Sequence, residues 1–471
     1  MIILGTNSVK DTGYDVANSL RFNDGSSDYL NRTLGSDGNR QKWTWSGWVK
    51  RSVFTSSQML FGCKSGNISA SLNFKDNQLR FLDYDDGSFG SQLKTNRLFR
   101  DVSAWYHIVV AYDTTQGTAA NRIKFYVNGV QETSFATSTY PSVNFNGYIN
   151  ESDYTHYIGS EDGTQNFFDG YMAEVCFIND QQLDPTSFGE FDEDSGIWKP
   201  IAVSGLTFGT NGFYLDFEDS SALGNDAAGS NNFTVNNLTA IDQSISTPTN
   251  IFATGNPLFP SDGTIAFSEG NLKLVSSGTN GGGLSTFGVS KGKWYIEVKQ
   301  TAVNEPLGNG ESLICVVGDP EVTKGSIDNY EGRAFAYGIR NHSGTKFENT
   351  SGSTSWHGNW TAGDIISIAL DMDNNRVYFA KNGQYADGSG NWDEAFTSSP
   401  AHLSLSTAKT NYFIGVGHSH GSATETFELN TGSPSFAISS GNTDGDGYGN
   451  FEYAVPSGYY SLNTKNLAEY G

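Results

Sequence analysis

The feature that most constrains the fold of this chain is a succession of short apolar runs, each closed by an Asn, Asp or Gly turn. Examples are SASLNFKDNQLRFLDYDDG, AWYHIVVAYD and NRIKFYVNGVQ, in which apolar and polar residues alternate over roughly strand length. Such alternation, with turn-forming residues at both ends, is typical of strands that cover a core with one face. No stretch keeps a 3.6-residue apolar period for long. The pattern predicts an all-β protein with little helix.

The length of the chain, 471 residues, exceeds what one hydrophobic core usually supports. The strand-and-turn pattern is regular to about Pro200 and returns from Ile265, whereas Pro248, Pro257 and Pro260 interrupt any β-ladder between them. We therefore expect an N-terminal arm (1–20), a first β-sandwich (21–200), an ordered connector (201–262), a second β-sandwich (263–437) and a C-terminal tail (438–471).

Two hairpins in the two halves of the chain have nearly the same sequence. They are NRIKFYVNG, residues 121–129, and NRVYFAKNG, residues 375–383. The closing Asn-Gly supplies the positive φ that a tight two-residue turn demands. Because the flanking sequences agree only in being strand-like, the similarity indicates two sheets that use the same turn rather than a recent duplication.

Charge and cysteine content exclude several classes of protein. The net charge of −23 and the absence of a Lys/Arg cluster disfavour nucleic-acid binding, and no apolar run approaches membrane-spanning length. The first residues, MIILGTNSVKDTG, lack the basic region of a secretory signal. Cys63, Cys176 and Cys315 are odd in number and lie in apolar, strand-like contexts, which predicts buried free thiols in a reducing cytosol.

Each half of the chain resembles a known domain family. WTWSGWVKRS, AWYHIVVAYD, NRIKFYVNGVQ and FFDGYMAEVCFIND resemble the laminin-G/pentraxin type of concanavalin-like sandwich over about residues 20–200. GKWYIEVKQ, AFAYGIRN, GDIISIALDMDNNRVYFAKNG, NYFIGVG and FELNTGSPSFAI resemble a SPRY domain over about residues 265–437. These resemblances imply two concanavalin-like jelly-roll β-sandwiches in tandem, joined by an irregular connector.

The order of the segments resembles structural proteins of tailed bacteriophages. This resemblance is carried by SLRFNDGSSDYLNRT, by NNFTVNNLTAIDQSISTPTN and by GYGNFEYAVPSGYYSLNTKNL near the end. It implies a non-enzymatic virion surface protein, a tail fibre, spike or capsid fibre, that is assembled in the host cytoplasm. Its implied partners are other virion proteins, bacterial surface glycans or envelope proteins, and further copies of itself, with a trimer as one option. The alternative is a capsid or tail decoration or assembly protein without a host ligand.

A polysaccharide depolymerase is a third hypothesis, and the sequence favours it least. The Glu-x-Asp-x-x-Glu pattern of concanavalin-like glycosidases and the Gly-x-Ser-x-Gly elbow do not occur, and EFDEDSG at residues 190–196 lacks the required spacing. His418 and His420 in GHSHG have no third ligand nearby, so a surface loop is the preferred interpretation. We therefore expect no enzymatic activity.

Calcium is the one cofactor that the sequence suggests. The loop GSEDGTQNFFDG resembles a pentraxin calcium loop, which implies oxygen ligands from Glu161, Asp162 and Gln165. A second acidic turn, LDYDDG, contributes the candidates Asp83, Asp85 and Asp86. The alternative for both loops is that the carboxylates are simply solvated.

A third acidic segment, TDGDGYGNFE, has oxygen-bearing side chains in the spacing of the first half of an EF-hand loop: Asp444, Asp446, Asn450 and Glu452. Val455 stands at the twelfth position, where the loop needs a bidentate Glu. A glycine-rich turn is therefore the preferred interpretation.

Recognition of sugars requires aromatic faces beside polar groups, because the C–H face of a pyranose stacks on an aromatic ring. The segment STSWHGNWTAGD offers Trp356, His357 and Asn359 as glycan-binding candidates. Trp356 lies in a Ser/Gly-rich loop, which favours exposure. Trp360 immediately precedes a strand and is predicted to lie in the core.

Overall fold

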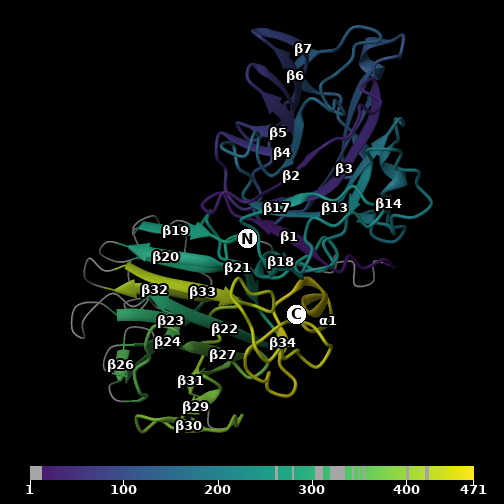
Figure 1. The fold of residues 1–471 in the computed structure, drawn as a ribbon. Coiled ribbons are helices and arrows are strands. Elements are labelled where there is room, and N and C mark those ends of the chain that lie inside the picture. Colours follow the sequence, from purple (N-terminus) through teal and green to yellow (C-terminus); the bar gives the residue numbers. More distant parts are fainter. Residues whose placement is uncertain are drawn as a thin grey trace. The chain divides into compact units, whose positions relative to one another are not determined.

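The computed structural model describes residues 13–259, 264–277, 281–302, 311–318, 335–341, 344–348, 351–353, 356–398, 402–419 and 424–471. Strands dominate these ranges, as predicted, and they include one α-helix, α1 (Thr464–Tyr470) (Figure 1). The chain divides into two compact units, one spanning Asp11–Thr249 and the other containing Asn250–Gly471.

The first unit contains two eight-stranded sheets, in the orders β10-β9-β8-β3-β13-β1-β18, with β16 paired to β13, and β11-β7-β6-β5-β4-β12-β2-β17. A two-stranded ribbon, β14-β15, accompanies them. The strands are β1 (Ser19–Phe22), β2 (Tyr29–Thr33), β3 (Lys42–Arg51), β4 (Ser57–Ser65), β5 (Ile68–Lys75), β6 (Gln78–Asp85), β7 (Ser88–Thr95), β8 (Tyr106–Asp113), β9 (Ile123–Val127), β10 (Val130–Gln131), β11 (Phe135–Thr139), β12 (Thr155–Ile158), β13 (Gly170–Asn179), β14 (Gly189–Phe191), β15 (Trp198–Pro200), β16 (Phe213–Leu215), β17 (Thr234–Asn236) and β18 (Gln243–Ser244).

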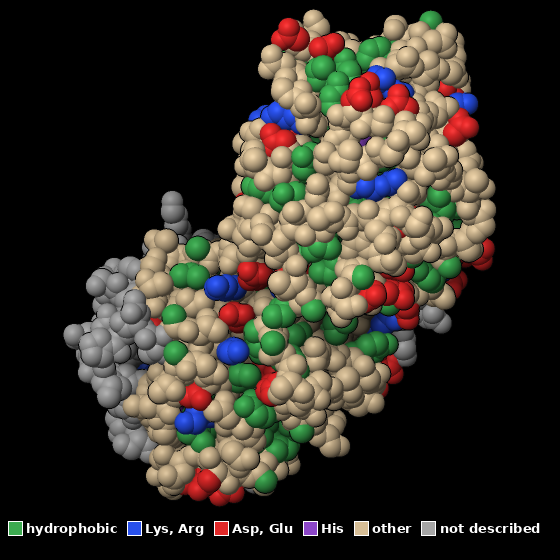
Figure 2. Space-filling model, viewed as in Figure 1, with side chains coloured by type: hydrophobic (Ala, Val, Ile, Leu, Met, Phe, Trp, Pro, Cys, Tyr) green, Lys and Arg blue, Asp and Glu red, His purple; other side chains and the backbone are tan. Residues whose placement is uncertain are grey.

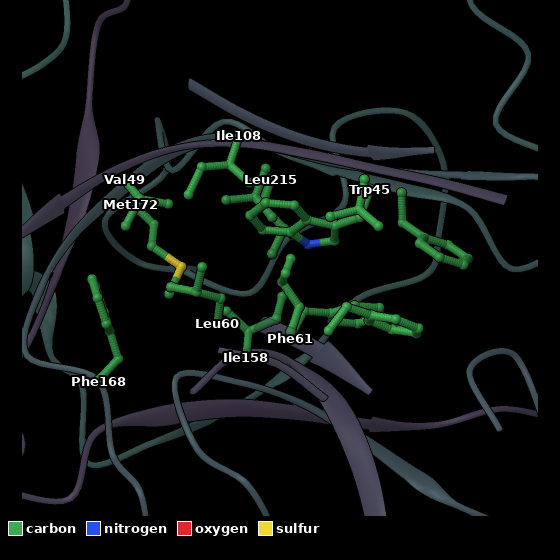
Figure 3. Packing of buried hydrophobic residues seen from close by; sticks show 14 of the residues in the cluster. Trp45, Val49, Leu60, Phe61, Ile108, Ile158, Phe168, Met172 and Leu215 are labelled. Atoms are coloured by element: carbon green, nitrogen blue, oxygen red, sulfur yellow. The ribbon is translucent and has the colours of Figure 1, made fainter. Parts of the chain in front are cut away.

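The core of the first unit lies between its two sheets. Figure 3 shows Trp45 and Ile108 from one sheet meeting Phe61 and Ile158 from the other. Trp45 is fully buried, and a Cβ at Gly47, on the same face of β3, would lie 2.8 Å from its ring. The motif WSGW therefore needs glycine at its third position, because the indole of Trp45 fills the space of a side chain there.

The segment expected to act as a connector contributes three short strands to the first unit. β16 pairs with β13, β17 with β2 and β18 with β1, so these strands extend both sheets. A buried ion pair between Arg21 and Asp242, with Nη2 and Oδ1 3.1 Å apart, holds the end of this segment against β1. The segment is ordered by pairing and by this charge contact.

The second unit contains a ten-stranded sheet, β19-β20-β33-β22-β27-β28-β29-β30 with β31 on β28 and β34 on β22, and a six-stranded sheet, β21-β32-β23-β24-β25-β26. The strands are β19 (Thr264–Ser268), β20 (Lys273–Ser277), β21 (Gly281–Val289), β22 (Lys293–Ala302), β23 (Glu311–Gly318), β24 (Ala336–Arg340), β25 (Thr345–Glu348), β26 (Ser351–Ser353), β27 (Ile365–Asp371), β28 (Arg376–Lys381), β29 (Gln384–Ala386), β30 (Trp392–Glu394), β31 (Leu403–Ser404), β32 (Tyr412–Ser419), β33 (Thr424–Asn430) and β34 (Tyr460–Ser461).

Apolar side chains of both sheets form the core of the second unit, and Trp360, 2% exposed, belongs to it as predicted. The segment after β33 returns to this core. The buried carboxylate of Asp444 accepts hydrogen bonds from the backbone N–H and hydroxyl of Ser461, at 2.9 and 2.7 Å, and from Asn466 in α1, at 2.8 Å. Asp444 therefore fastens the chain end.

The two similar hairpins have the same turn geometry, as predicted. φ is 49° at Asn128 and 78° at Gly129, and 49° at Asn382 and 83° at Gly383. In addition, each Asn side-chain oxygen accepts a hydrogen bond from the strand that precedes the hairpin. Asn128 Oδ1 accepts from the N–H of His107 at 2.8 Å, and Asn382 Oδ1 accepts from the N–H of Ile365 at 3.0 Å. The shared Asn therefore fixes both the turn and the register of the neighbouring strand.

We expect the substitution Asn382→Ala to lower the free energy of unfolding of the second unit by about 2 kcal/mol. It removes the hydrogen bond to Ile365 and places a side chain with poor tolerance for positive φ at the turn. Urea unfolding measures the change. Asn382→Gly is the control: it keeps the turn but loses the side chain, so it should lower the free energy of unfolding by less. Equal losses in both variants would show that the positive φ at residue 382 does not contribute to the effect of Asn382→Ala.

The cysteines lie in the interior, and charged side chains lie on the surface. Cys63, Cys176 and Cys315 are buried and unpaired, as predicted. In Figure 2, Lys and Arg side chains are scattered among uncharged polar ones on the face shown. Within the described ranges, no helix has the length and apolar character needed to cross a membrane.

Candidate ligand-binding site

A cavity of about 430 Å³ lies in the second unit. Strands β25, β29 and β30 and the segments that follow β26 and β30 form its wall. The lining residues are Lys346, Trp356, Tyr385, Ala386, Asp387, Gly388, Glu394, Ala395, Thr397 and His402. Cavities of about 300–1,000 Å³ that combine aromatic rings with a few polar groups are typical of small-molecule sites.

Trp356 is held in this wall by its backbone and by two neighbouring side chains. Its N–H donates to the carbonyl of Gly344 at 2.7 Å. The Lys346 ammonium lies 4.9 Å from the centre of the indole ring, in a cation–π contact, and the His402 ring meets the indole edge-on at 4.8 Å. The indole is half-buried rather than fully exposed.

His402 presents a fixed tautomer to the cavity. Its Nδ1 accepts a hydrogen bond from the backbone N–H of Phe379 at 3.0 Å, so the ring hydrogen of the neutral imidazole is on Nε2. Burial, assisted by the positive charge of Lys346, lowers the pKa of His402 to about 4, so the ring is neutral at pH 7. Within the described residues, neither His402 Nε2 nor Trp356 Nε1 has a hydrogen-bond partner.

Charged groups of both signs lie on the cavity wall. Lys346 Nζ donates to the carbonyl of His402 at 3.1 Å, and burial lowers the pKa of this lysine. The Glu394 side chain is exposed. The carboxylate of Asp387 accepts from the backbone N–H groups of Asn391 and Ser389, and the Asn391 N–H contributes most to lowering its pKa. Lys346 and Glu394 are thus the charges that a ligand meets, because Asp387 is occupied by its own turn.

The predicted glycan-binding residues separate in the structure. Trp356 lines the cavity. His357 is only 3% exposed, and its two ring nitrogens lie 2.8 and 3.3 Å from the carbonyls of Gly358 and Thr345, so it belongs to the protein interior instead. Asn359 is exposed, and its Oδ1 accepts from the N–H of Gly344 at 3.1 Å. Sequence reasoning missed Lys346 and His402, because no sequence pattern shows that these residues contact Trp356 from other segments of the chain.

The predicted calcium loop is occupied by internal contacts. Lys64 of β4 lies 3.7 Å from a Glu161 carboxylate oxygen and 3.3 Å from an Asp162 oxygen. Asp162 also accepts hydrogen bonds from the Thr164 hydroxyl at 2.7 Å and from the Gln165 amide at 2.8 Å. An ammonium group of the protein itself thus contacts both carboxylates that were expected to attract a cation, and it offsets one of their two negative charges.

The second acidic turn divides between core and surface. Asp83 is fully buried and accepts from the Ser91 hydroxyl at 2.7 Å, and burial raises its pKa to about 6. Asp85 is exposed and accepts from the Tyr148 hydroxyl at 3.0 Å. Asp86, at the turn itself, accepts from the Asn67 amide at 3.0 Å. These three carboxylates therefore do not converge on one point.

The remaining candidates have structural roles or lie outside the described residues. The Ser276 hydroxyl donates to the carbonyl of Gly281 at 2.9 Å, so the 2.6 Å contact with His418 Nδ1 has the histidine as donor. His420 lies outside the described residues. Asp446 accepts from the Tyr470 hydroxyl and Glu452 from Ser439, both within the chain end. Across the described ranges, no group of three or more His, Cys, Asp or Glu side chains could hold a metal ion.

Comparison with known families decides what the two units are. A model described as the concanavalin A-like lectin/glucanases superfamily, of laminin G type, matches residues 24–184, and a SPRY domain model matches residues 293–389. The chain contains a laminin G-type domain and a SPRY domain. The cavity belongs to the SPRY region, since Lys346 to Gly388 lie inside that match and Glu394 to His402 follow it.

Three solved structures are among those that are similar to the chain. The SPRY domain of human HERC1 is 22% identical, with 34% of this chain and 87% of that chain covered and a TM-score of 0.26. Domains LG4-5 of the mouse laminin alpha1 chain are 13% identical, with 87% of this chain and 89% of that chain covered and a TM-score of 0.29. A heptameric SAP-like pentraxin from Limulus polyphemus is 16% identical, with 36% of this chain and 79% of that chain covered and a TM-score of 0.27. No curated protein matches the chain significantly.

Proposed function

We propose that this chain is a non-enzymatic binding protein of a bacteriophage virion surface, in which the SPRY domain binds a host-surface glycan through the Trp356 cavity. The observation that carries the proposal is the cavity itself. An indole, a tyrosine ring, a neutral imidazole donor and two opposite charges surround a volume of about 430 Å³. Aromatic rings beside hydrogen-bonding groups suit a sugar, whose ring has an apolar face and a polar edge.

The groups on the cavity wall support binding rather than catalysis. His402 Nδ1 already accepts a backbone hydrogen bond, so this nitrogen cannot act as a general base. The Asp387 carboxylate is held by its own turn, and Glu394 is an exposed carboxylate. A glycosidase of the usual kind needs two carboxylates across the scissile bond, one of them with a raised pKa, whereas the pKa of Asp387 is lowered.

Two measurements test the proposal. The first is electron microscopy of purified virions labelled with an antibody to this chain, in which we expect particles to be decorated at a surface structure. The second is a glycan array of bacterial surface polysaccharides, probed with the full chain. Unlabelled virions would refute the virion location, and an array without bound polysaccharide would refute the glycan ligand.

We expect the substitution Trp356→Ala to weaken binding of the polysaccharide found on the array about tenfold or more, because it removes the aromatic wall of the cavity. Isothermal titration calorimetry measures the affinity. Trp356→Phe keeps an aromatic ring but loses the indole N–H, and it should retain more affinity than Trp356→Ala. Thermal unfolding of each variant separates loss of the site from loss of the fold, and unchanged affinity in a folded Trp356→Ala variant would place the ligand elsewhere.

A decoration or assembly protein without a host ligand is the second candidate, and one feature of the laminin G-type domain favours it. Phe191, at the end of β14, and Ile197, just before β15, are 49% and 40% exposed. Exposed apolar side chains of this size are common at contacts between proteins. If the chain is a decoration or assembly protein, Phe191→Ala should lower its incorporation into virions. If the chain is a glycan-binding protein, the same substitution should leave glycan binding unchanged.

A further inference from the structure

Building on the proposed function, we propose that the sugar bound in the Trp356 cavity carries a carboxylate, and that Lys346 binds this group. The glycan would thus be an acidic polysaccharide with uronic acid or similar residues. The inference rests on the partners that Lys346 lacks, on the donors beside it and on the acceptors elsewhere on the wall.

Five of the partly buried lysines of this acidic chain are ion-paired. Carboxylate oxygens lie within 3.1–3.5 Å of the ammonium groups of Lys42, Lys64, Lys94, Lys199 and Lys293. Lys346, within the described residues, has no ion pair; it donates to the carbonyl of His402 and lies over the ring of Trp356. The exposed carboxylate of Glu348 acts on the charge of Lys346, but no carboxylate of the described residues forms an ion pair with it. A half-buried ammonium on the wall of a cavity can therefore still pair with an anionic ligand.

The neighbours of Lys346 are also hydrogen-bond donors. Trp356 and His402 contact each other, Lys346 contacts both, and Trp356 Nε1 and His402 Nε2 each carry a hydrogen. A carboxylate accepts several hydrogen bonds at once, whereas a sugar hydroxyl accepts at most two and must place its own hydrogen elsewhere. Three such donors on residues that contact one another suit a carboxylate better than a hydroxyl.

The rest of the wall suits the hydroxyl groups of the same sugar. Glu394 and Thr397, on β30 and just after it, supply a carboxylate and a hydroxyl that accept hydrogen bonds, and Tyr385 supplies a second ring. A negatively charged acceptor also disfavours ligands with several anionic groups, such as a phosphate-rich polymer. One carboxylate per bound sugar, flanked by neutral hydroxyls, fits both parts of the wall.

The test uses the acidic polysaccharide that the glycan array identifies, together with the same polysaccharide after chemical reduction of its carboxylates to alcohols. We expect reduction to weaken binding to the full-length wild-type chain about tenfold or more, which corresponds to 1.4 kcal/mol. Lys346→Gln should bind the native polysaccharide as weakly as wild type binds the reduced one, and should not distinguish the two. Lys346→Arg should regain part of the preference.

Lys299→Gln is the matched control, because Lys299 is also half-buried and also lies 4.9 Å from an aromatic ring centre, that of Phe436, but outside the cavity lining. It should keep the wild-type preference. The inference is refuted if the array selects neutral polysaccharides only, if reduction leaves affinity unchanged, if Lys346→Gln weakens both forms equally, or if an acidic peptide binds more tightly than the sugar. Absence of any bound polysaccharide refutes the proposed function itself, so the two failures are distinguishable.

Discussion

Replacing Trp45 by Ala should lower the free energy of unfolding of the laminin G-type domain by about 4 kcal/mol, the cost of truncating a fully buried aromatic side chain. Trp45 is 0% exposed and lies between the sheets among Ile108, Phe61 and Leu215 (Figure 3). Its indole also occupies the space above Gly47, which has no side chain that could fill the cavity that remains. Differential scanning calorimetry of the full chain measures the change.

Two control variants sharpen this prediction. Trp45→Phe should cost much less than Trp45→Ala, because Trp45 Nε1 is buried and lacks a hydrogen-bond partner among the described residues, so loss of that donor carries no penalty. Phe89→Ala, at a side chain that is 47% exposed, should change stability by less than about 0.5 kcal/mol. Equal losses for Trp45→Ala and Phe89→Ala would contradict the packing of the two sheets.

Replacing Lys50 by Met should stabilise the laminin G-type domain by about 2 kcal/mol at pH 7. Lys50 is only 2% exposed, and its ammonium lies 4.4 Å from the centre of the Tyr171 ring. Burial lowers the pKa of Lys50 from 10.5 to about 8, which corresponds to about 3 kcal/mol, and the cation–π contact offsets part of this cost. Met has a similar shape and no charge to desolvate.

The sign of the pH dependence follows from the lowered pKa. Below pH 8 both the folded and the unfolded chain hold the Lys50 proton, so the cost of burying the charge is fully present. Between pH 8 and 10.5 the unfolded chain binds more protons than the folded one, and stability contributed by this group rises with pH. The advantage of Lys50→Met over wild type should therefore shrink across this interval. Urea unfolding at a series of pH values measures it.

Lys42→Met is the matched control for Lys50→Met, because both lysines lie on β3. Lys42 is one-third exposed and pairs with Asp113, with Nζ and Oδ2 3.4 Å apart. Its substitution should be neutral or slightly destabilising at pH 7. A stabilisation of Lys42→Met as large as that of Lys50→Met would show that loss of net charge, rather than burial, is responsible.

The candidate site was only partly predictable from the sequence. Trp356 could be chosen because an aromatic residue in a Ser/Gly-rich loop suggests exposure, and it does line the cavity. Lys346 and His402 could not be chosen, because they become site candidates only through their contacts with Trp356. Lys346 lies ten residues before Trp356 in the sequence, and His402 lies 46 residues after it. His357, adjacent to Trp356, lies in the interior because its ring packs 4.9 Å from Trp392 and 5.6 Å from Trp360.

The acidic loops illustrate the same limit. Resemblance to a pentraxin calcium loop selected Glu161 and Asp162 as oxygen-bearing side chains of a loop, and both lie in a loop between β12 and β13. The sequence could not show that Lys64, on a different strand, reaches both carboxylates. Whether acidic side chains attract a cation from solution or are neutralised from within depends on the nearest charge in space, and this charge is distant in sequence.

The all-β class and the Asn-Gly hairpins followed from the sequence alone, because side-chain alternation and positive-φ turns are local properties of the backbone. The two domain families followed from motifs that resemble theirs. The tertiary structure was needed to show that residues 201–249 add the short strands β16, β17 and β18 to the first sandwich, since strands of two or three residues have too little pattern to be recognised. It also decided which of the polar candidates surround a cavity. Burial and ion pairing depend on contacts between different segments of the chain, and a local sequence pattern does not predict these contacts.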